Sequence, residues 1–222
     1  FNSSSLIKNQ IKNPHTIPVI IISFNQLFYL KKLVNFLIER KFSNIVIIDN
    51  NSTYSPLLEY FDTLSDNSNI TIHKLKENIG HLVFWKTKRL FKKYSKGYYI
   101  VTDADIVPND STPNDFVNKF LSILNKNIHI TKVGFSLSID DIPETNPNKK
   151  YIIFWEKQFW KNKIDDYYMA YIDTTFALYR PRFKRRKARK FIEAIRLDKP
   201  YTALHGGWYL DPKKLTDEQK FY

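Results

Sequence analysis

The sequence lacks several residue types and patterns that define other classes of protein. It has no cysteine among its 222 residues and only 5 glycines. Without cysteine it forms neither disulfides nor thiolate metal sites, and nothing implies an oxidising compartment. No apolar run approaches the roughly 20 residues that cross a bilayer, and no signal-peptide pattern is present. We therefore expect a cytoplasmic protein, either free or held peripherally at a membrane. Because the chain begins with Phe1 rather than Met, we also expect it to be a piece of a longer protein.

Acidic residues are scarce relative to basic ones. The chain has 22 Asp and Glu against 35 Lys and Arg, which gives a net charge of +13. A charge excess of this size favours anionic partners such as nucleotide diphosphates or an acidic membrane surface. Part of it is concentrated at residues 180–190 (RPRFKRRKARK), which we interpret either as a solvated face or as a surface for anionic lipids. No RNP, KH or zinc-finger pattern is present, so we expect no nucleic-acid partner.

The first half of the chain alternates strand and helix patterns. Apolar, β-branched runs start about 26–28 residues apart, at 17–23, 44–49, 70–75 and 98–103. Amphipathic stripes lie between them, at Leu27–Ile38 and Val83–Tyr94, and a helix is signalled by Thr112 as N-cap and Pro113 at the first position. This alternation predicts right-handed βαβ units and a mostly parallel sheet flanked by helices, which is the α/β class.

The second half is less regular. Residues 132–138 and 171–179 are typical of strands, and the aromatic-rich stretch 151–160 is typical of a helix. Aromatic side chains in this half are interpreted either as core or as platforms for sugar rings. They are Trp155, Phe159, Trp160, Tyr167, Tyr168 and Trp208.

Asp103 and Asp105 end the apolar run that starts at Tyr98, where buried carboxylates are costly unless something pairs with them. Residues i and i+2 of an extended segment point to the same side, so both acids can face one ion. Such oxygen ligands suit Mg²⁺ or Mn²⁺, which usually bring a phosphate with them. No G-x-G-x-x-G turn or P-loop is present to hold a diphosphate, so we expect a metal at these acids to hold it.

Polar residues also follow the other three apolar runs. Parallel sheets bind ligands at the carboxyl ends of their strands, so these residues should converge on one edge. Asn and Ser in such turns are often helix caps, which leaves a structural role open for each one singly. The set comprises Ser23, Asn25, Asp49, Asn50, Asn51, Ser52, Asn78, Gly80 and His81.

Four segments in order carry a likeness to a known family: 17–25 (IPVIIISFN), 45–52 (IVIIDNNS), 77–80 (ENIG) and 99–105 (YIVTDAD). Together they resemble the GT-A fold glycosyltransferases, in particular family 2-like enzymes. The resemblance implies a Rossmann-like, mostly parallel sheet flanked by helices, with a smaller acceptor-side mixed sheet. The implied organisation is a flexible lead-in (1–16) and one GT-A domain (17–222), with a nucleotide-sugar-binding half (17–110) and an acceptor-binding half (111–222).

The resemblance also implies roles for individual residues. Asp105 would bind Mn²⁺ or Mg²⁺, Asp103 would contact the ribose or the metal shell, and His205 would complete the metal coordination. A core or hydrogen-bonding role is the alternative for His205. The remaining nucleotide-sugar contacts expected are Ser23, Asn25, Asp49, Asn51, Asn78, Gly80, His81, Ala104 and Trp208.

Inverting transfer needs a carboxylate that takes the proton from the acceptor hydroxyl. The family's usual Glu-Asp pair is not evident, so the candidates for this base are Asp173, Asp140, Asp141 and Glu156. We favour Asp173 because it lies in the run 171–179, which resembles the family's acceptor-side strand. A cap or turn role is the alternative for each of the four.

The expected function is transfer of a sugar from a UDP- or GDP-sugar to a hydroxyl of a growing glycan or of a lipid-linked sugar. Two alternatives remain. Residues 103–107 (DADIV) also fit the haloacid dehalogenase phosphatase motif, although that motif belongs on the first strand of its domain. The other alternative is a non-catalytic nucleotide-binding module. A sugar-phosphate nucleotidyltransferase is disfavoured, since the Gly-rich turn after its first strand is missing.

Overall fold

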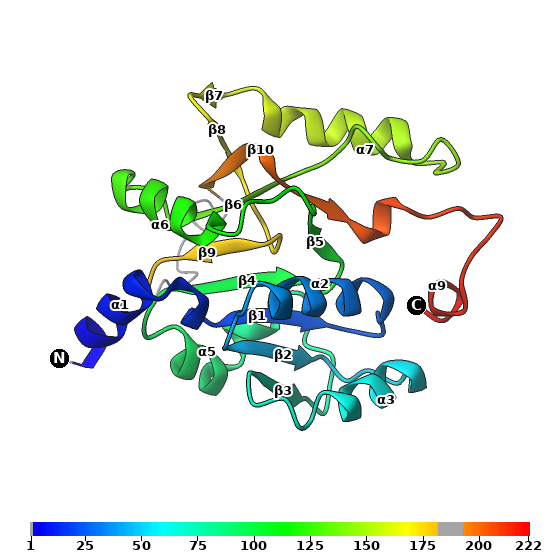
Figure 1. Cartoon of the computed structure of the whole chain (residues 1–222). Helices are drawn as coiled ribbons and strands as arrows, with labels where there is room; N and C mark the ends of the chain where they lie inside the picture. The colour runs from blue at the N-terminus through cyan, green and yellow to red at the C-terminus, as the bar shows by residue number, and fades with distance from the viewer. Residues whose placement is uncertain (1, 182–192) are drawn as a thin grey trace.

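The computed structural model describes residues 2–181 and 193–222. Its centre is one ten-stranded sheet in the order β3-β2-β1-β4-β9-β6-β10-β8-β7, with β5 paired to β10 (Figure 1). Helices cover both faces of the sheet, as the α/β pattern predicts. Within the described ranges no helix is both long and apolar enough to cross a membrane.

Four parallel strands form one side of the sheet: β1 (Val19–Ser23), β2 (Ile45–Asp49), β3 (Ile70–Lys74) and β4 (Tyr99–Asp103). Each lies within an expected run. The strands β1 and β2 are buried along their whole length, which explains why they read as continuous apolar runs rather than alternating ones. Ser23 pairs with Asp49, so the polar strand ends meet at one edge as expected.

Two apolar layers sandwich this parallel region. One face packs against α2 (Phe28–Glu39), α3 (Ser55–Thr63) and α6 (Phe116–Lys126). The other packs against the two short helices α4 (Val83–Lys86) and α5 (Lys88–Tyr94). Alternate residues of β1 serve the two layers, with Ile21 on the first and Ile20 on the second.

The other side of the sheet is mixed and continuous with the parallel strands. It contains β5 (Ile106–Pro108), β6 (Lys132–Leu137), β7 (Lys163–Ile164), β8 (Tyr167–Tyr171), β9 (Ala177–Tyr179) and β10 (Glu193–His205). The long strand β10 is parallel to β6 and antiparallel to β5 and β8. The predicted helix at 151–160 is α7 (Lys149–Glu156) followed by the 3-10 helix η2 (Lys157–Trp160). The chain ends with the 3-10 helix η3 (Gly206–Trp208) and α9 (Asp217–Phe221).

Two local expectations differ from the structure. The expected strand at 171–179 is divided between the end of β8 and β9, because 172–176 forms a turn whose Thr174 carbonyl binds the Asp103 amide. The helix expected to start at Pro113 starts at Phe116 instead, with Asp115 at its N-cap position.

The expected lead-in at 1–16 is largely helical: α1 (Asn2–Lys12) is followed by the 3-10 helix η1 (Pro14–Thr16). Its anchor is Gln10, which is buried and bonds both backbone groups of Tyr98, at 2.9 and 2.8 Å. The hydrophobic pattern of the sequence does not reveal a polar side chain that bonds the backbone just before β4 in this way.

Most of the basic run 180–190 lies outside the described residues. Its first member, Arg180, is described, and its guanidinium donates to the carbonyls of Ile130 (2.8 Å) and Asn127 (2.9 Å). These carbonyls follow the C-terminus of α6, where a cation is favourable. Arg180 therefore has a structural role at the end of a helix.

Candidate functional site

Asp103 and Asp105 lie where β4 meets the mixed side of the sheet. The amide of Ala104, between them, donates to the Ile22 carbonyl at 3.0 Å, which fixes the turn to β1. The Asp103 carboxylate accepts the hydroxyl of Thr174. Burial raises the pKa of Asp103 to about 8, and the charges of Asp105 and Asp173 act in the same direction. Burial and the neighbouring charges of Asp105 and Asp173 thus all disfavour the ionised form of Asp103.

His205 stands directly beside Asp105 because β5 and β10 are antiparallel, with Ile106 opposite His205. The Asp105 Oδ2 atom lies 3.2 Å from His205 Nδ1. Within the described part of the chain, that buried nitrogen has no aligned hydrogen-bond partner. The Trp208 ring stacks flat on the imidazole, with 5.0 Å between centroids and 7° between planes. Two of the expected metal ligands and Trp208 are therefore brought together.

The glycine pair after His205 permits this close approach. The Gly207 amide donates to Asp105 Oδ2 at 3.3 Å, and the Gly206 amide donates to the Asp105 carbonyl at 2.7 Å. A Cβ on Gly206 would lie 2.3 Å from the Tyr29 ring, so only glycine fits there. Tyr29 was not expected as a site residue, because it lies on the amphipathic stretch that reads simply as a core helix.

These residues suit a divalent cation in part. Asp105 supplies an oxygen and His205 a buried nitrogen with no other aligned partner, and the three nearby carboxyl groups favour a positive charge. Among the described residues no group of three or more His, Asp or Glu side chains is arranged to hold a metal ion, and the Asp103 carboxylate is bonded to Thr174. A bound cation would need further oxygens from its substrate, as is usual for Mg²⁺ bound with phosphates.

The loops after β1 and β2 hold each other through side chains. The Asn25 side-chain oxygen accepts hydrogen bonds from the backbone amides of Thr53 (2.8 Å) and Tyr54 (3.1 Å). The backbone amide of Asn25 donates to Ser52 Oγ at 2.9 Å. Asn25 adopts φ 50°, a left-handed conformation that Asn tolerates. The Asp49 carboxylate accepts the Ser52 amide at 3.1 Å. Both side chains therefore hold the loops after β1 and β2 in place.

Ser23 and Asn51 differ from these two in their surroundings. The Ser23 hydroxyl is fully buried at the end of β1 and has no partner among the described atoms. Asn51 is exposed, with φ 68°.

The loop after β3 is tied to this edge by Asn50. Its Nδ2 donates to Asn78 Oδ1 at 2.7 Å, and its Oδ1 accepts the Ile79 amide at 2.9 Å. Gly80 takes φ 85°, which favours glycine, and His81 after it is exposed. Asn50 is one of the polar residues that follow the apolar runs, but the resemblance assigns it no contact with the nucleotide sugar. Its bonds make it the residue that positions Asn78 and Gly80.

The four candidates for the catalytic base lie in different surroundings. Asp173 is exposed, and its charge contributes to the raised pKa of Asp103, so it lies near that acid. Asp140 forms an exposed ion pair with Lys199, and Asp141 accepts the Tyr209 hydroxyl at 2.6 Å. Glu156 is buried in an ion pair with Arg196 beneath α7. The structure thus brings only Asp173 of the four into the electrostatic neighbourhood of Asp103.

A buried cation, Lys132, supports the Asp173 turn. Its ammonium donates to the Asp173 carbonyl and to the Tyr179 hydroxyl, both at 3.1 Å. Burial lowers the pKa of Lys132 to about 7, while the charge of Asp173 opposes that shift. The sequence analysis does not identify Lys132 or Thr174, because Lys132 is simply the first residue of the run 132–138 and Thr174 lies within the run 171–179.

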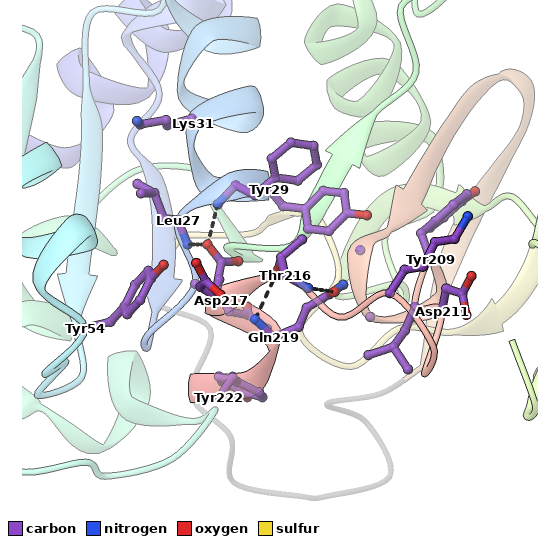
Figure 2. A pocket seen from close by; sticks show the side chains of 17 residues that line it. Leu27, Tyr29, Lys31, Tyr54, Tyr209, Asp211, Thr216, Asp217, Gln219 and Tyr222 are labelled. Carbon is purple, nitrogen blue, oxygen red and sulfur yellow. Dashed lines mark hydrogen bonds between the residues drawn. The ribbon is translucent and has the colours of Figure 1, made fainter.

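A cavity of about 740 Å³ opens next to Gly206 and Gly207 (Figure 2). One wall is the start of α2, with Tyr29 and Lys31, and the other is the segment 209–222, which we call the C-terminal segment. Glu218 fastens this segment: its Oε2 accepts the amides of Leu27 (2.8 Å) and Phe28 (2.9 Å). The carboxylate thereby caps the N-terminus of α2, where negative charge is favourable.

Two aromatic side chains of the C-terminal segment cover the loops after β1 and β2. The Phe221 ring lies 5.0 Å from that of Tyr54, and the Tyr222 ring lies 6.1 Å from that of Phe24. Burial raises the pKa of Tyr222, and the charges of Asp105 and Asp103 raise it further, so this side chain lies near the two acids. Nothing in the sequence signalled this contact.

Solved structures with a similar fold match most of the chain. A mannosyltransferase from Pyrobaculum calidifontis, in complex with GDP-Man and Mn²⁺, aligns over 85% of this chain with a TM-score of 0.53 and 11% identity. GalNAc-T7, crystallised with UDP, GalNAc and Mn²⁺, aligns over 86% with a TM-score of 0.55 and 13% identity. The fold is that of GT-A-type glycosyltransferases.

The GT-A likeness rests on structure. No protein-family model and no curated protein sequence matches the chain. The alignments cover 56% of the mannosyltransferase and 43% of GalNAc-T7, so this chain spans about half the length of these enzymes. The GT-A fold confirms the expected fold class. Asp103 follows three parallel strands, which does not fit the first-strand position of the phosphatase motif.

Proposed function

We propose that this chain is a metal-dependent glycosyltransferase that uses a nucleotide-diphosphate sugar. The observation that carries the proposal is the pairing of Asp105 with His205 at the edge of a GT-A sheet, beside a cavity of about 740 Å³. The two solved GT-A enzymes were crystallised with GDP-Man or UDP and with Mn²⁺, which supports a donor and a cation of this kind here.

The donor would lie across the carboxyl ends of β1, β2 and β4. Ser23, with its unpartnered buried hydroxyl, and the loop at Asn25 and Asp49 would contact the base and ribose. The loop at Asn78 and Gly80, held by Asn50, would form the far side. In the described structure the C-terminal segment covers part of this edge, so donor binding would either use Tyr222 as a wall or displace it.

Asp105 and His205 would hold Mn²⁺ or Mg²⁺, with Asp103 in the outer shell through Thr174. Such a cation neutralises the charge that develops on a diphosphate leaving group. The Gly207 amide already points at Asp105 Oδ2 and keeps the carboxylate oriented. Trp208, stacked on His205, fixes the imidazole plane and shields it from water.

Asp173 is the base that these contacts favour. Its backbone is held by Lys132 and Tyr179, at 3.1 and 3.2 Å, while its carboxylate is exposed. An exposed carboxylate can accept the proton of an incoming acceptor hydroxyl. The acceptor would be a glycan or a lipid-linked sugar that approaches from the mixed side of the sheet.

Nucleotide titration tests the proposal directly. UDP and GDP are titrated calorimetrically in the presence of Mn²⁺ and in the presence of EDTA. Sugars linked to the nucleotide that binds more tightly are then assayed for metal-dependent hydrolysis. We expect at least one nucleotide to bind at least about tenfold more tightly with Mn²⁺. If both nucleotides bind as tightly in EDTA as they do with Mn²⁺, the proposed metal dependence is refuted. Binding without turnover would instead support the non-catalytic nucleotide module.

A further inference from the structure

Helix α7 is packed with its aromatic side outward. Tyr151, Phe154 and Trp155 are 66%, 78% and 53% exposed, although they are the largest side chains of the helix. The spacing i, i+3, i+4 places all three on one face. We call these residues the α7 stripe. Large apolar side chains gathered on one exposed face mark a contact surface rather than a core.

On the opposite side of α7 a single charged residue, Glu156, is buried, and its contacts fix the orientation of the helix. Glu156 is 2% exposed and forms an ion pair with Arg196 of β10, which is 4% exposed. Arg196 also donates to the Tyr171 carbonyl at 2.7 Å and stacks 4.2 Å from the Phe159 ring. Rotating α7 to bury the stripe would break this pair and leave two uncompensated buried charges, which is strongly unfavourable.

Lysines flank the α7 stripe. Lys150, Lys157 and Lys161 are exposed, and none of them forms an ion pair within the described residues. The nearby acid Glu144 is already paired, with Lys149 at 2.6 Å. The surface around the stripe is therefore positive, in a chain whose net charge is +13.

We propose that the α7 stripe docks on an anionic membrane surface. A short helix with Tyr, Phe and Trp on one side and lysines beside them has the composition of an interfacial helix. The aromatic rings would enter the headgroup region while the lysine ammonium groups stay among the lipid phosphates. The alternative occupant is a protein with an acidic, partly apolar surface, and the vesicle experiment below distinguishes the two.

The position of α7 links this surface to the candidate site. The loop before the helix contains Asn146, which is buried and donates to the Trp208 carbonyl at 2.7 Å. The cavity beside Gly206 and Gly207 is lined by none of the α7 residues, so the stripe is not part of that pocket. A membrane under α7 would bring the end of the sheet that carries His205 close to the lipid surface.

Vesicle flotation with the full chain tests the proposal. Vesicles of phosphatidylcholine alone are compared with vesicles that contain about 30% phosphatidylglycerol. We expect binding to the anionic vesicles only, weakened by salt, and at least about tenfold weaker for the double variant Phe154→Ser, Trp155→Ser. The matched control is Ile128→Ser, which removes a side chain that is 72% exposed at a distant loop; it should bind as the unaltered chain does.

Two further measurements keep the proposal open to refutation. Brominated lipids should quench tryptophan fluorescence less in Trp155→Phe than in the unaltered chain. A variant with neutral residues at 184–187 separates the α7 stripe from the basic run: if it alone abolishes binding and the α7 double variant binds normally, the proposal fails. It also fails if light scattering shows a dimer that the double variant dissolves, because the stripe would then pair two copies of the chain.

Discussion

The parallel side of the sheet and the mixed side reach their stability by different means. In the parallel side, β1 and β2 are buried along their full length, and helices on both faces supply apolar partners. In the mixed side, buried charges take part as well: Arg196 pairs with Glu156, and Lys132 lies under Asp173. The first side is a conventional α/β core, whereas the second depends on specific polar pairs.

The same contrast holds for the candidate site. The parallel side contributes loops that asparagines hold rigid, chiefly Asn25 and Asn50. The mixed side contributes two of the candidate site residues, His205 on a long strand and Asp173 on a turn. Asp103 and Asp105 lie at the junction. In the proposed function the donor would lie along the loops that these asparagines hold, and the acceptor would approach along the mixed side.

The largest expected effect comes from the junction itself. Asp105→Ala removes the carboxylate beside His205 and should lower donor turnover at least about 10³-fold, since charge on the leaving group is no longer neutralised. The protein should keep its melting temperature, because the change also removes one of three mutually repelling carboxyl groups. Turnover and circular dichroism are measured together.

The control for Asp105→Ala is Asp66→Ala, an exposed acid of the parallel side, which should alter neither turnover nor melting temperature. Near-normal turnover of Asp105→Ala with added Mn²⁺ would contradict the metal assignment. Failure of that variant to fold would show that Asp105 is structural.

How much the sequence predicts also differs between the two sides. Every parallel strand was located within two residues, because a fully buried strand is a plain apolar run. The Asp103-Ala-Asp105 motif was found for a similar reason: carboxylates at the end of such a run need an explanation. His205 required the family resemblance, since its place beside Asp105 depends on the long-range pairing of β5 with β10.

What could not be predicted are the long-range polar contacts. Glu218 binds amides 190 residues away in sequence, and Arg196 reaches Glu156 across 40 residues. Neither contact leaves a periodic pattern, because each involves a single side chain and a partner chosen by the tertiary fold. The roles of Asp173 and Trp208 stay predictions for the same reason: their contacts to donor or acceptor depend on ligands.

The second expected effect tests the polar pairs of the mixed side. Arg196→Met leaves Glu156 buried without its partner and should lower the free energy of unfolding by about 3–5 kcal/mol. The double variant Arg196→Met, Glu156→Leu removes both charges and should recover most of that loss. Urea denaturation of the two variants and of Glu156→Leu alone gives the coupling between the side chains.

The same double variant decides whether Glu156 has a catalytic role. If the double variant folds and binds nucleotide but has lost turnover, Glu156 rather than Asp173 would be favoured as the catalytic base. A loss of nucleotide binding in proportion to unfolding, with turnover per folded molecule unchanged, supports its structural role. No recovery of stability in the double variant would contradict the account of the mixed side given above.

The third expected effect tests the rigidity of the parallel side. Asn50→Ala removes the bonds to Asn78 and Ile79 and should lower stability by about 1–3 kcal/mol, because the Ile79 amide loses its partner. Nucleotide affinity should fall as well, since the Asn78 loop is no longer held at the strand edge. Asn162→Ala, at an exposed position on the mixed side, is the matched control. Unchanged affinity in Asn50→Ala would mean that the donor does not use this loop.

The smallest expected effect concerns Glu218, which joins the two sides. Glu218→Ala frees the amides of Leu27 and Phe28 at the start of α2 and should cost about 0.5–2 kcal/mol, the usual value for a lost N-cap. Because α9 has only five residues, from Asp217 to Phe221, and its other contacts include two ring pairs, Phe221 with Tyr54 and Tyr222 with Phe24, the C-terminal segment should open before the sheet does. Hydrogen exchange should therefore quicken at 209–222 and at the first turn of α2, and stay unchanged in β1. Glu59→Ala, an exposed acid on α3, should quicken neither.

If the segment is a wall of the donor site, nucleotide should bind more weakly to Glu218→Ala; if the segment must leave before the donor enters, nucleotide should bind more tightly. An unaltered exchange pattern would show that Phe221 and Tyr222, rather than the carboxylate, hold the segment in place.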